Sequence, residues 1–336
     1  MLASTGQLER DVRALALPEG RMVGTTGHDQ ARRYLLDRMD AIGLRPFTGD
    51  SFELPYQVDG QDFRNLVGTV PGADPSKAPV LIGAHYDSAI PAPCADDNAA
   101  AVAIALSAAA ELIATPAART VVIAIFDAEE PPHYLGPSMG SIRFYEDQRA
   151  GRAISAAVIM DLVGHDVPVP IGGGSLLIPT LPELLFVTGA ESHPALARIV
   201  EAAAGSVEHL PTIAALNEYV GDVSDHHVFR LNDVPYLFLS CGRWQHYHEP
   251  TDTPDKLNYL KMARILEYLV HVVRVMCDRE LTNATPTDTV SLEIKLLERA
   301  IGPLGMPLLK KALGLRRFET RADLDQFARA LLSTGL

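Results

Sequence analysis

The amino-acid sequence predicts an α/β fold, in which a mostly parallel (mixed) β-sheet is sandwiched between helices and a helical C-terminal extension follows. Two observations lead to this prediction. Short, continuously apolar runs, as expected of strands that are covered on both faces, occur at residues 80–84, 121–126, 156–160 and 235–240. Segments with apolar residues at helical spacing separate or follow these runs, at residues 98–113, 138–146, 194–204 and 256–279.

The chain before the first apolar run predicts two helices and an edge strand. We expect helices around residues 8–15 and 28–42 and a strand near 65–70. Much later, Thr253 has the side chain of an N-cap and Pro254 suits a first helical position. These two residues predict where the long helix after the last strand begins.

Residues 1–283 are predicted to form one catalytic body and residues 284–336 a helical extension packed on it. The extension is expected to form three short helices, broken at Gly302-Pro303 and at Gly314. Its leucine-rich segment 304–313 has only two charged residues. We therefore favour packing on the body over binding to a membrane surface. A homo-oligomer interface and a cap over the cleft are the other roles left open.

Composition and charge limit the classes of partner. The chain has 336 residues, of which 47% are hydrophobic and 21% charged, as in soluble globular proteins with a large core. Its net charge of −13 argues against nucleic acid as a partner, because nucleic-acid binding needs a basic patch.

The three cysteines lack CxxC spacing and are expected to be free thiols. With no signal-peptide pattern and no apolar run near about 20 residues, we expect a cytoplasmic protein that does not bind membranes.

Potential metal ligands follow the predicted strands directly. Taken singly, each is more often a solvated loop residue or a helix cap. In an open α/β sheet, however, the carboxyl ends of the strands gather ligands at one edge, so these side chains are expected to converge. Glu129 and Glu130 are the sharpest pair, because adjacent acids after an apolar strand repel each other unless a cation is present. The candidates are His85, Asp87, Asp96, Asp97, Asp127, Glu129, Glu130, Asp161, His246 and His248.

This combination of histidines and carboxylates predicts a zinc site, with manganese or cobalt as alternatives. Five ligands, one of them bridging, suffice for two ions about 3.5–4 Å apart. Such a site activates water, polarises a carbonyl and uses a nearby carboxylate to move the proton, which is the chemistry of amide or ester hydrolysis. No Walker or GxGxxG loop follows a strand.

Six short motifs occur in an order that resembles a known enzyme family. They are GAHYDS at 83–88, ADDNAA at 95–100, FDAEE at 126–130, MDLVG at 160–164, SDHHVF at 224–229 and YHEPTDTPDKL at 247–257. Together they resemble the co-catalytic zinc aminopeptidases of metallopeptidase family 28, which also contains the glutaminyl cyclases. The likeness extends over about residues 5–280. It implies a zinc-exopeptidase-like fold and a peptide substrate with a free N-terminus.

The resemblance also implies a ligand set for two zinc ions per chain. His85 and Asp161 would bind one ion, Glu130 and His248 the other, and Asp97 would bridge them.

Three further residues receive roles from the resemblance. Glu129 would act as general base and acid, Asp87 would orient His85, and Tyr247 would donate a hydrogen bond to the oxyanion.

Four neighbouring residues are set aside. Asp96 stands one position before the bridge of the family pattern, and His246 one position before its Tyr-His pair. Asp225 and His226 are expected to belong to the wall of the site and not to its ligands.

Three functions remain in competition. The leading hypothesis is an aminopeptidase that hydrolyses the N-terminal peptide bond. The second is a glutaminyl cyclase, which would use one zinc to form N-terminal pyroglutamate. Asp97-Asn98 and Tyr247 disfavour it, since the cyclase pattern prefers Asp-Ser and a Trp at these places, and the only Trp is Trp244. The third is a metal-free binding module on the same scaffold.

Overall fold

The computed structural model describes residues 2–167 and 181–333. Within them, nine strands form one sheet with the order β1-β3-β5-β4-β6-β9-β7-β8, and β2 pairs with β3. The strands are β1 (Arg45–Pro46), β2 (Glu53–Val58), β3 (Gln61–Val70), β4 (Val80–His85), β5 (Val121–Phe126), β6 (Ala156–Met160), β7 (Leu185–Thr188), β8 (Thr212–Ala214) and β9 (Tyr236–Ser240).

The sheet is mixed, with a parallel centre, as the sequence predicted. β5, β4, β6 and β9 run parallel to one another, and β7 and β8 form a second parallel pair. The antiparallel pairs are those of β3 with β1, β2 and β5, and that of β7 with β9. Every residue of β4, β5 and β6 is buried, which is why these strands are unbroken apolar runs in the sequence.

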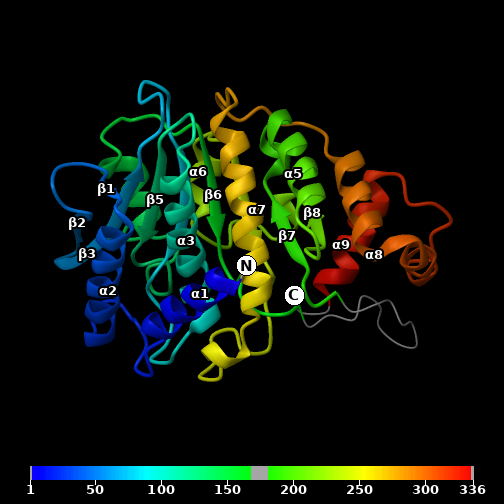
Figure 1. Cartoon of the computed structure of the whole chain (residues 1–336). Helices are drawn as coiled ribbons and strands as arrows, with labels where there is room; N and C mark the ends of the chain where they lie inside the picture. Colours follow the sequence, from blue (N-terminus) through cyan, green and yellow to red (C-terminus); the bar gives the residue numbers. More distant parts are fainter. Residues whose placement is uncertain (1, 168–180, 334–336) are drawn as a thin grey trace.

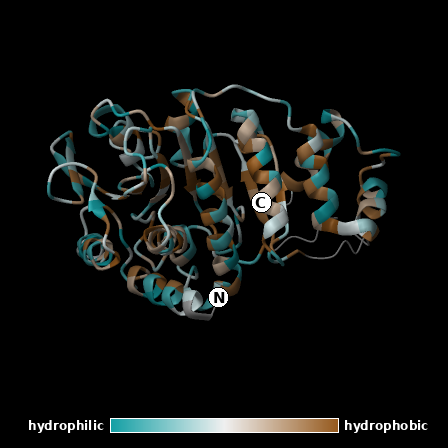
Figure 2. Cartoon of the chain, turned by 45° about the horizontal axis from the view of Figure 1, so that its top comes forward, coloured by the Kyte–Doolittle hydropathy of each residue, from teal (hydrophilic) through white to brown (hydrophobic). Residues whose placement is uncertain are grey.

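Helices cover both faces of the sheet (Figure 1). One layer packs on alternate strand residues such as Ile82, Ile123 and Val158, and the opposite face packs on Leu81 and Ala124. The first layer contains α1 (Leu2–Leu15), α2 (Thr26–Ile42), α3 (Ala101–Ala114), α5 (Pro194–Ser206) and α7 (Tyr259–Cys277), and the other face has α4 (Gly140–Arg143) and α6 (His226–Leu231). Figure 2 shows apolar strands at the centre and helices that are polar on their outer sides.

Two expectations about elements need correction. The long helix α7 begins at Tyr259, where the Asn258 side chain accepts a hydrogen bond from the backbone N–H of Lys261. Thr253 and Pro254 instead open a separate turn of 3₁₀ helix, Pro254–Lys256, and the Thr253 side chain makes no cap bond. The strand expected at an edge of the sheet is β3, which pairs with β5 on one side and with β1 and β2 on the other and is therefore an interior strand. β1, β2, β7 and β8 were not predicted, and β1, β7 and β8 have only two to four residues, too few for a periodicity signal.

The C-terminal extension packs along the β8 edge of the sheet (Figure 1). It consists of α8 (Val290–Ala312) and α9 (Arg321–Leu332). The break expected at Gly302-Pro303 is present as a kink inside α8, where Gly302 has φ 70°. The break expected at Gly314 is also present, since α8 ends at Ala312 and Gly314 has φ 69°.

One described segment, Ala95–Ala114, has the length and apolarity of a membrane span. Within the protein, 78% of that window is buried. It contains α3, the central helix of the layer that covers the sheet.

Candidate metal centre

The residues predicted as metal ligands lie at the carboxyl ends of four neighbouring parallel strands. Because β5, β4, β6 and β9 run in the same direction, these ends meet at one edge of the sheet. His85 ends β4, Glu130 and Asp161 follow β5 and β6, Asp97 stands before α3, and His248 lies in the loop after β9. The structure therefore brings together all five residues, which are far apart in the sequence.

Asp97 lies between the two histidines. Its Oδ1 is 3.4 Å from Nε2 of His85, and its Oδ2 is 3.2 Å from Nε2 of His248. A second carboxylate flanks each histidine. Oδ1 of Asp161 is 3.7 Å from Nε2 of His85, and Oε2 of Glu130 is 3.2 Å from Nε2 of His248. Each half of the centre thus has one imidazole nitrogen, one carboxylate of its own and one oxygen of Asp97.

Several polar atoms of this centre lack a hydrogen-bond partner among the described residues. They are Nε2 of His85, Nε2 of His248, Oε1 of Glu130 and Oδ1 of Asp161. Buried polar atoms are normally paired, so unpaired ones that face each other need an explanation. Ligand atoms of His85, Asp97 and Glu130 lie within 4.8 Å of one another. Imidazole nitrogen and carboxylate oxygen are zinc ligands, and the residues present therefore fit a metal ion.

Ionisation at the centre is strongly perturbed. Burial raises the pKa of Glu130 to about 8, and the negative charge of Asp97 adds to this effect. Burial also raises the pKa of Asp161. For His248, burial lowers the pKa, but the adjacent carboxylates of Asp97 and Glu130 outweigh it and raise the pKa to about 10. Without a cation, these side chains retain protons because so many carboxylates lie close together. A bound cation would neutralise the same negative charge and replace those protons.

Glu129 faces the centre beside these five residues. Its Oε2 is 3.8 Å from Nε2 of His85, and its side chain is almost completely buried. Burial raises the pKa of Glu129 well above its usual range, and the charges of Glu130 and Asp161 add to this although His85 opposes it. A carboxylate with a raised pKa is suited to accept and release a proton near neutral pH.

Asp87 holds two parts of the centre in place. Its Oδ1 lies 3.3 Å from Nδ1 of His85. The same carboxylate accepts hydrogen bonds from the backbone N–H groups of Glu129 (3.1 Å) and Glu130 (3.0 Å). Burial alone would raise the pKa of Asp87, but His85 and these N–H donors hold it below its usual range. Asp87 therefore fixes the imidazole of one strand end relative to the backbone of the next.

Two further positioning residues were not identified from the sequence. The Asp252 carboxylate accepts hydrogen bonds from the backbone N–H of Asp96 (3.0 Å) and of Asp97 (3.2 Å). The buried Arg21 donates to the carbonyls of Tyr86 (2.8 Å) and Asp97 (3.3 Å). Asp252 stands inside the motif at 247–257, which could have indicated it. Nothing in the sequence links Arg21 to partners that are so distant along the chain.

Tyr247 borders the centre next to His248. The two rings stack with centroids 3.9 Å apart, and the Arg243 guanidinium lies 4.9 Å from the centroid of the Tyr247 ring. Burial raises the pKa of Tyr247 above its usual range, so its hydroxyl keeps its proton at neutral pH and remains a donor.

The backbone is strained at three points of the centre. Ala128 precedes Glu129 with φ 55°, Leu162 follows Asp161 with φ 53°, and His248 itself has φ 56°. Left-handed conformations of residues other than glycine cost of order 1–3 kcal/mol each and are concentrated at functional sites. Here they direct two strand ends and one loop toward the same point.

The residues set aside in the sequence lie elsewhere. Asp96 accepts from the backbone N–H of Gly164 (2.6 Å) and pairs with Nδ1 of His165 (2.6 Å), and His246 contacts Thr251 Oγ1 (2.7 Å).

Asp225 lies beside the centre, where the charges of His85, Asp87 and Asp161 act on its carboxyl group, and His226 follows it at the start of α6. Both are fully buried. Burial raises the pKa of Asp225 to about 7 and lowers that of His226 to about 4. The His226 ring stacks on Phe238, with centroids 4.3 Å apart. Its other contacts, with Tyr236 and the Gly221 carbonyl, also lie outside the ligand set.

A serine-hydrolase pattern, GxSxG, is present at residues 136–140. Its Ser138 lies in the loop after β5, where Oγ is 2.9 Å from Nδ1 of His133. A nucleophile elbow requires a sharp turn directly between a strand and a helix, with an acid on the histidine. Ser138 is not on such a turn, and among the described residues no carboxylate pairs with His133. The pattern therefore gives no second hydrolase site.

Comparison with known proteins places these features in a family. The model of the family described as "Peptidase family M28" matches residues 65–273. The uncharacterized protein YfbL of Escherichia coli K12 is 28% identical over 291 residues, which cover 80% of this chain and 87% of YfbL. The matched region contains all of the predicted ligands.

Two solved structures have the same fold. A Zn-dependent exopeptidase from Parabacteroides distasonis is 16% identical with a TM-score of 0.64, over 80% of this chain and 97% of that one. The glutaminyl cyclase of Bacteroides thetaiotaomicron, bound to N-acetylhistamine, is 17% identical with a TM-score of 0.62, over 80% of this chain and 97% of that one. At such low identity, the likeness shows the fold alone.

Proposed function

Since the chain belongs to peptidase family M28, we propose that it is a metal-dependent aminopeptidase that hydrolyses the N-terminal peptide bond of peptides. In this proposal two zinc ions occupy the metal centre. His85 and Asp161 hold one ion, Glu130 and His248 the other, and Asp97 bridges them. The zinc-dependent exopeptidase with the same fold supports the choice of metal and of reaction class.

The position of Asp97 carries the proposal. Its two carboxylate oxygens face different histidines at 3.4 and 3.2 Å, and each histidine has its own carboxylate neighbour. A site for one ion would need only one of these halves. Two equivalent halves that share one carboxylate are the arrangement expected of a two-metal hydrolase.

The reaction follows from the residues around this centre. When bound, zinc polarises the scissile carbonyl and lowers the pKa of water. Glu129 accepts the proton of the attacking water and passes it to the leaving nitrogen as the C–N bond breaks. Tyr247 donates a hydrogen bond to the carbonyl oxygen as negative charge develops on it. The acidic side chains around the metal centre attract the free α-ammonium group of the substrate.

The test is mass spectrometry of a peptide pool incubated with the zinc-loaded protein. We expect loss of single N-terminal residues. The Glu129→Gln variant should slow this reaction about 10²–10⁴-fold, which is the usual contribution of general acid–base catalysis. Glu208→Gln, which changes an exposed glutamate, is the matched control and should leave the rate unchanged. Equal activity of wild type and Glu129→Gln would refute the role of Glu129.

A glutaminyl cyclase is the second candidate, favoured by the solved cyclase with the same fold. The pool should therefore contain peptides that begin with Gln. Loss of ammonia from these peptides alone, without release of residues, would replace the aminopeptidase by a cyclase. Metal analysis separates the two further, since a cyclase needs one zinc per chain and the proposed aminopeptidase needs two.

A further inference from the structure

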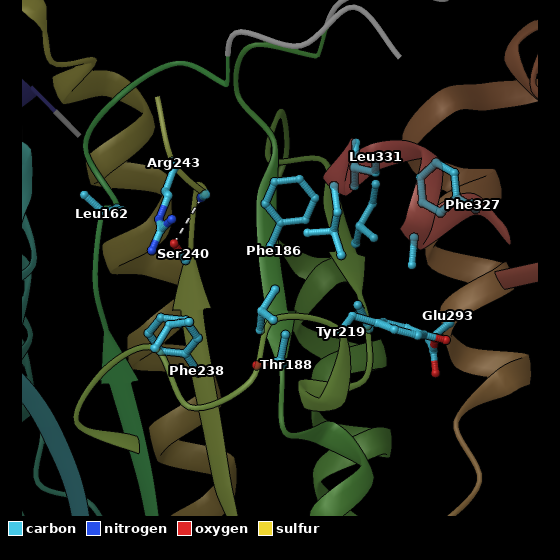
Figure 3. Close-up of a pocket in the computed structure, with 18 of the residues that line it drawn as sticks. Leu162, Phe186, Thr188, Tyr219, Phe238, Ser240, Arg243, Glu293, Phe327 and Leu331 are labelled. Atoms are coloured by element: carbon cyan, nitrogen blue, oxygen red, sulfur yellow. Dashed lines mark hydrogen bonds between the residues drawn. The ribbon is translucent and has the colours of Figure 1, made fainter. Parts of the chain in front are cut away.

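A mostly apolar pocket lies between the sheet and the C-terminal extension (Figure 3). It has a volume of about 280 Å³. Asp161, Leu162 and Tyr247 line its end next to the metal centre, and Leu324 and Phe327 of α9 line it on the side of the extension. A cavity of about 150 Å³ lined by apolar side chains is enough to hold benzene. The pocket therefore has room for an aromatic or a long aliphatic side chain.

The sheet and the extension supply opposite walls. Phe186 of β7 and Phe238 of β9 project from adjacent antiparallel strands, and Leu331 of α9 lies across from them (Figure 3). Leu324, Phe327, Ala328 and Leu331 recur at the helical spacing that puts side chains on one face of α9. That face is turned toward the pocket.

Polar contacts fix the extension in this position. Both guanidinium ends of Arg321, at the start of α9, donate to the Glu293 carboxylate of α8 at 2.8 Å. Tyr219, which precedes α6, donates to Asp325 of α9 at 2.5 Å. Glu293 is only 2% exposed. The wall formed by α9 is therefore tied both to the other helix of the extension and to the body.

We propose that α9 of the C-terminal extension is a specificity-determining wall of this pocket, which sets how long a side chain of the N-terminal substrate residue can be accommodated. The inference rests on the proposed aminopeptidase activity, because continuity with Asp161 and Tyr247 places the substrate side chain beside the scissile bond. A short side chain would leave most of the pocket unfilled, whereas a long one reaches the apolar face of α9. Polar lining residues such as Thr188, Ser240 and Arg243 come from the sheet and the loop after it and not from α9.

The test uses amino-acid p-nitroanilides whose unbranched side chains lengthen in steps: alanine, norvaline, norleucine, aminooctanoic acid and aminodecanoic acid. Each methylene that enters the pocket should raise kcat/KM about fourfold. The increase should stop at the length at which the chain reaches α9. The same series as amino-acid amides, titrated calorimetrically into the Glu129→Gln protein, should show the same steps in Kd without any turnover.

Ala328→Leu is the diagnostic variant, because Ala328 is buried and lines the pocket on α9. We expect the ratio of kcat/KM for aminooctanoic acid over alanine to fall about tenfold or more, and the increase to stop at a shorter chain. Ala330→Leu makes the same change on the exposed side of α9 and should keep the wild-type ratio. Thermal unfolding of both variants checks that they fold.

The outcomes separate the inference from the proposed function. If the anilides are hydrolysed but their rates do not depend on length, or if both variants behave alike, the inference is wrong while the aminopeptidase stands. If no anilide is hydrolysed, the proposed function fails. The calorimetric series then decides the inference, which is overturned if Kd does not change with chain length or does not respond to Ala328→Leu.

Discussion

The buried imidazole of His226 makes the stability of the protein depend on pH. Burial lowers its pKa from 6.5 to about 4, with its Nε2 3.2 Å from the Gly221 carbonyl. At pH 7 the residue is neutral in both the folded and the unfolded chain, so it has no effect. As the pH falls below 6.5, the unfolded chain takes up the proton first, and the free energy of unfolding decreases until about pH 4.

We therefore expect His226→Gln to lose part of the acid sensitivity of the wild type. At pH 5 the His226 term amounts to ~2 kcal/mol, calculated from the two pKa values. The measurement is urea unfolding between pH 7 and pH 5, with both proteins metal-free so that zinc binding does not contribute. His209→Gln, at an exposed histidine, is the control. A constant difference in stability between wild type and His226→Gln across this range would contradict the prediction.

Single residues of the centre could be predicted from the sequence because each stands directly at a strand end. His85, Glu130 and Asp161 needed no knowledge of distant contacts, since the order of apolar runs already placed them at one edge. Arg21 could not be predicted, because its partners are backbone carbonyls. Any residue can supply a carbonyl, so no pattern in the sequence marks such a contact.

At the scale of elements, the loop before α7 determines where Asp97 lies. Asp252 in this loop accepts hydrogen bonds from two successive backbone N–H groups at the turn that carries Asp97. In Asp252→Asn, the side-chain NH₂ group would face one of these backbone N–H groups and could not accept its hydrogen bond. We expect zinc affinity to fall about 10–100-fold, as with other residues that hold metal ligands in place.

Competition with a fluorescent zinc chelator measures this loss of affinity. Asp255→Asn alters an exposed carboxylate of the same loop that does not contact the turn of Asp97, so it should bind zinc as the wild type does. Equal zinc affinity of Asp252→Asn and Asp255→Asn would show that the loop does not position Asp97.

Helices and strands could be predicted where their own residues determine the structure. They were missed where contacts with other parts of the fold determine it. β4, β5 and β6 are buried on both faces and appear as apolar runs. β8 has only three residues and exists because β7 pairs with it and α8 packs on it. The start of α7 was misplaced for a similar reason. Thr253 and Pro254 are good helix-start residues, but the chain needs another turn before Asn258 can cap the helix beside the sheet.

For the whole molecule, the contacts of the extension suggest that it unfolds together with the body. α8 packs on β8 and α5, so the core is continuous from the sheet into the extension. A unit that shares its core with its neighbour is expected to unfold cooperatively with it.

Glu293→Gln tests this at the buried carboxylate that binds Arg321 at 2.8 Å through both oxygens. The substitution removes the buried charge that Arg321 faces and leaves Arg321 with the Tyr219 hydroxyl (3.2 Å) and Asp288 (4.0 Å). We expect a loss of about 1–3 kcal/mol in the free energy of unfolding. If the extension belongs to the same cooperative unit, thermal unfolding followed by circular dichroism should remain a single transition at a lower Tm. Hydrogen exchange should then accelerate in the sheet as well as in α8 and α9.

Glu298→Gln changes an exposed glutamate of the same helix and should leave Tm unchanged. A new early transition limited to α8 and α9, with the sheet as protected as before, would show instead that the extension unfolds by itself, and the pocket wall would then open without unfolding of the metal centre.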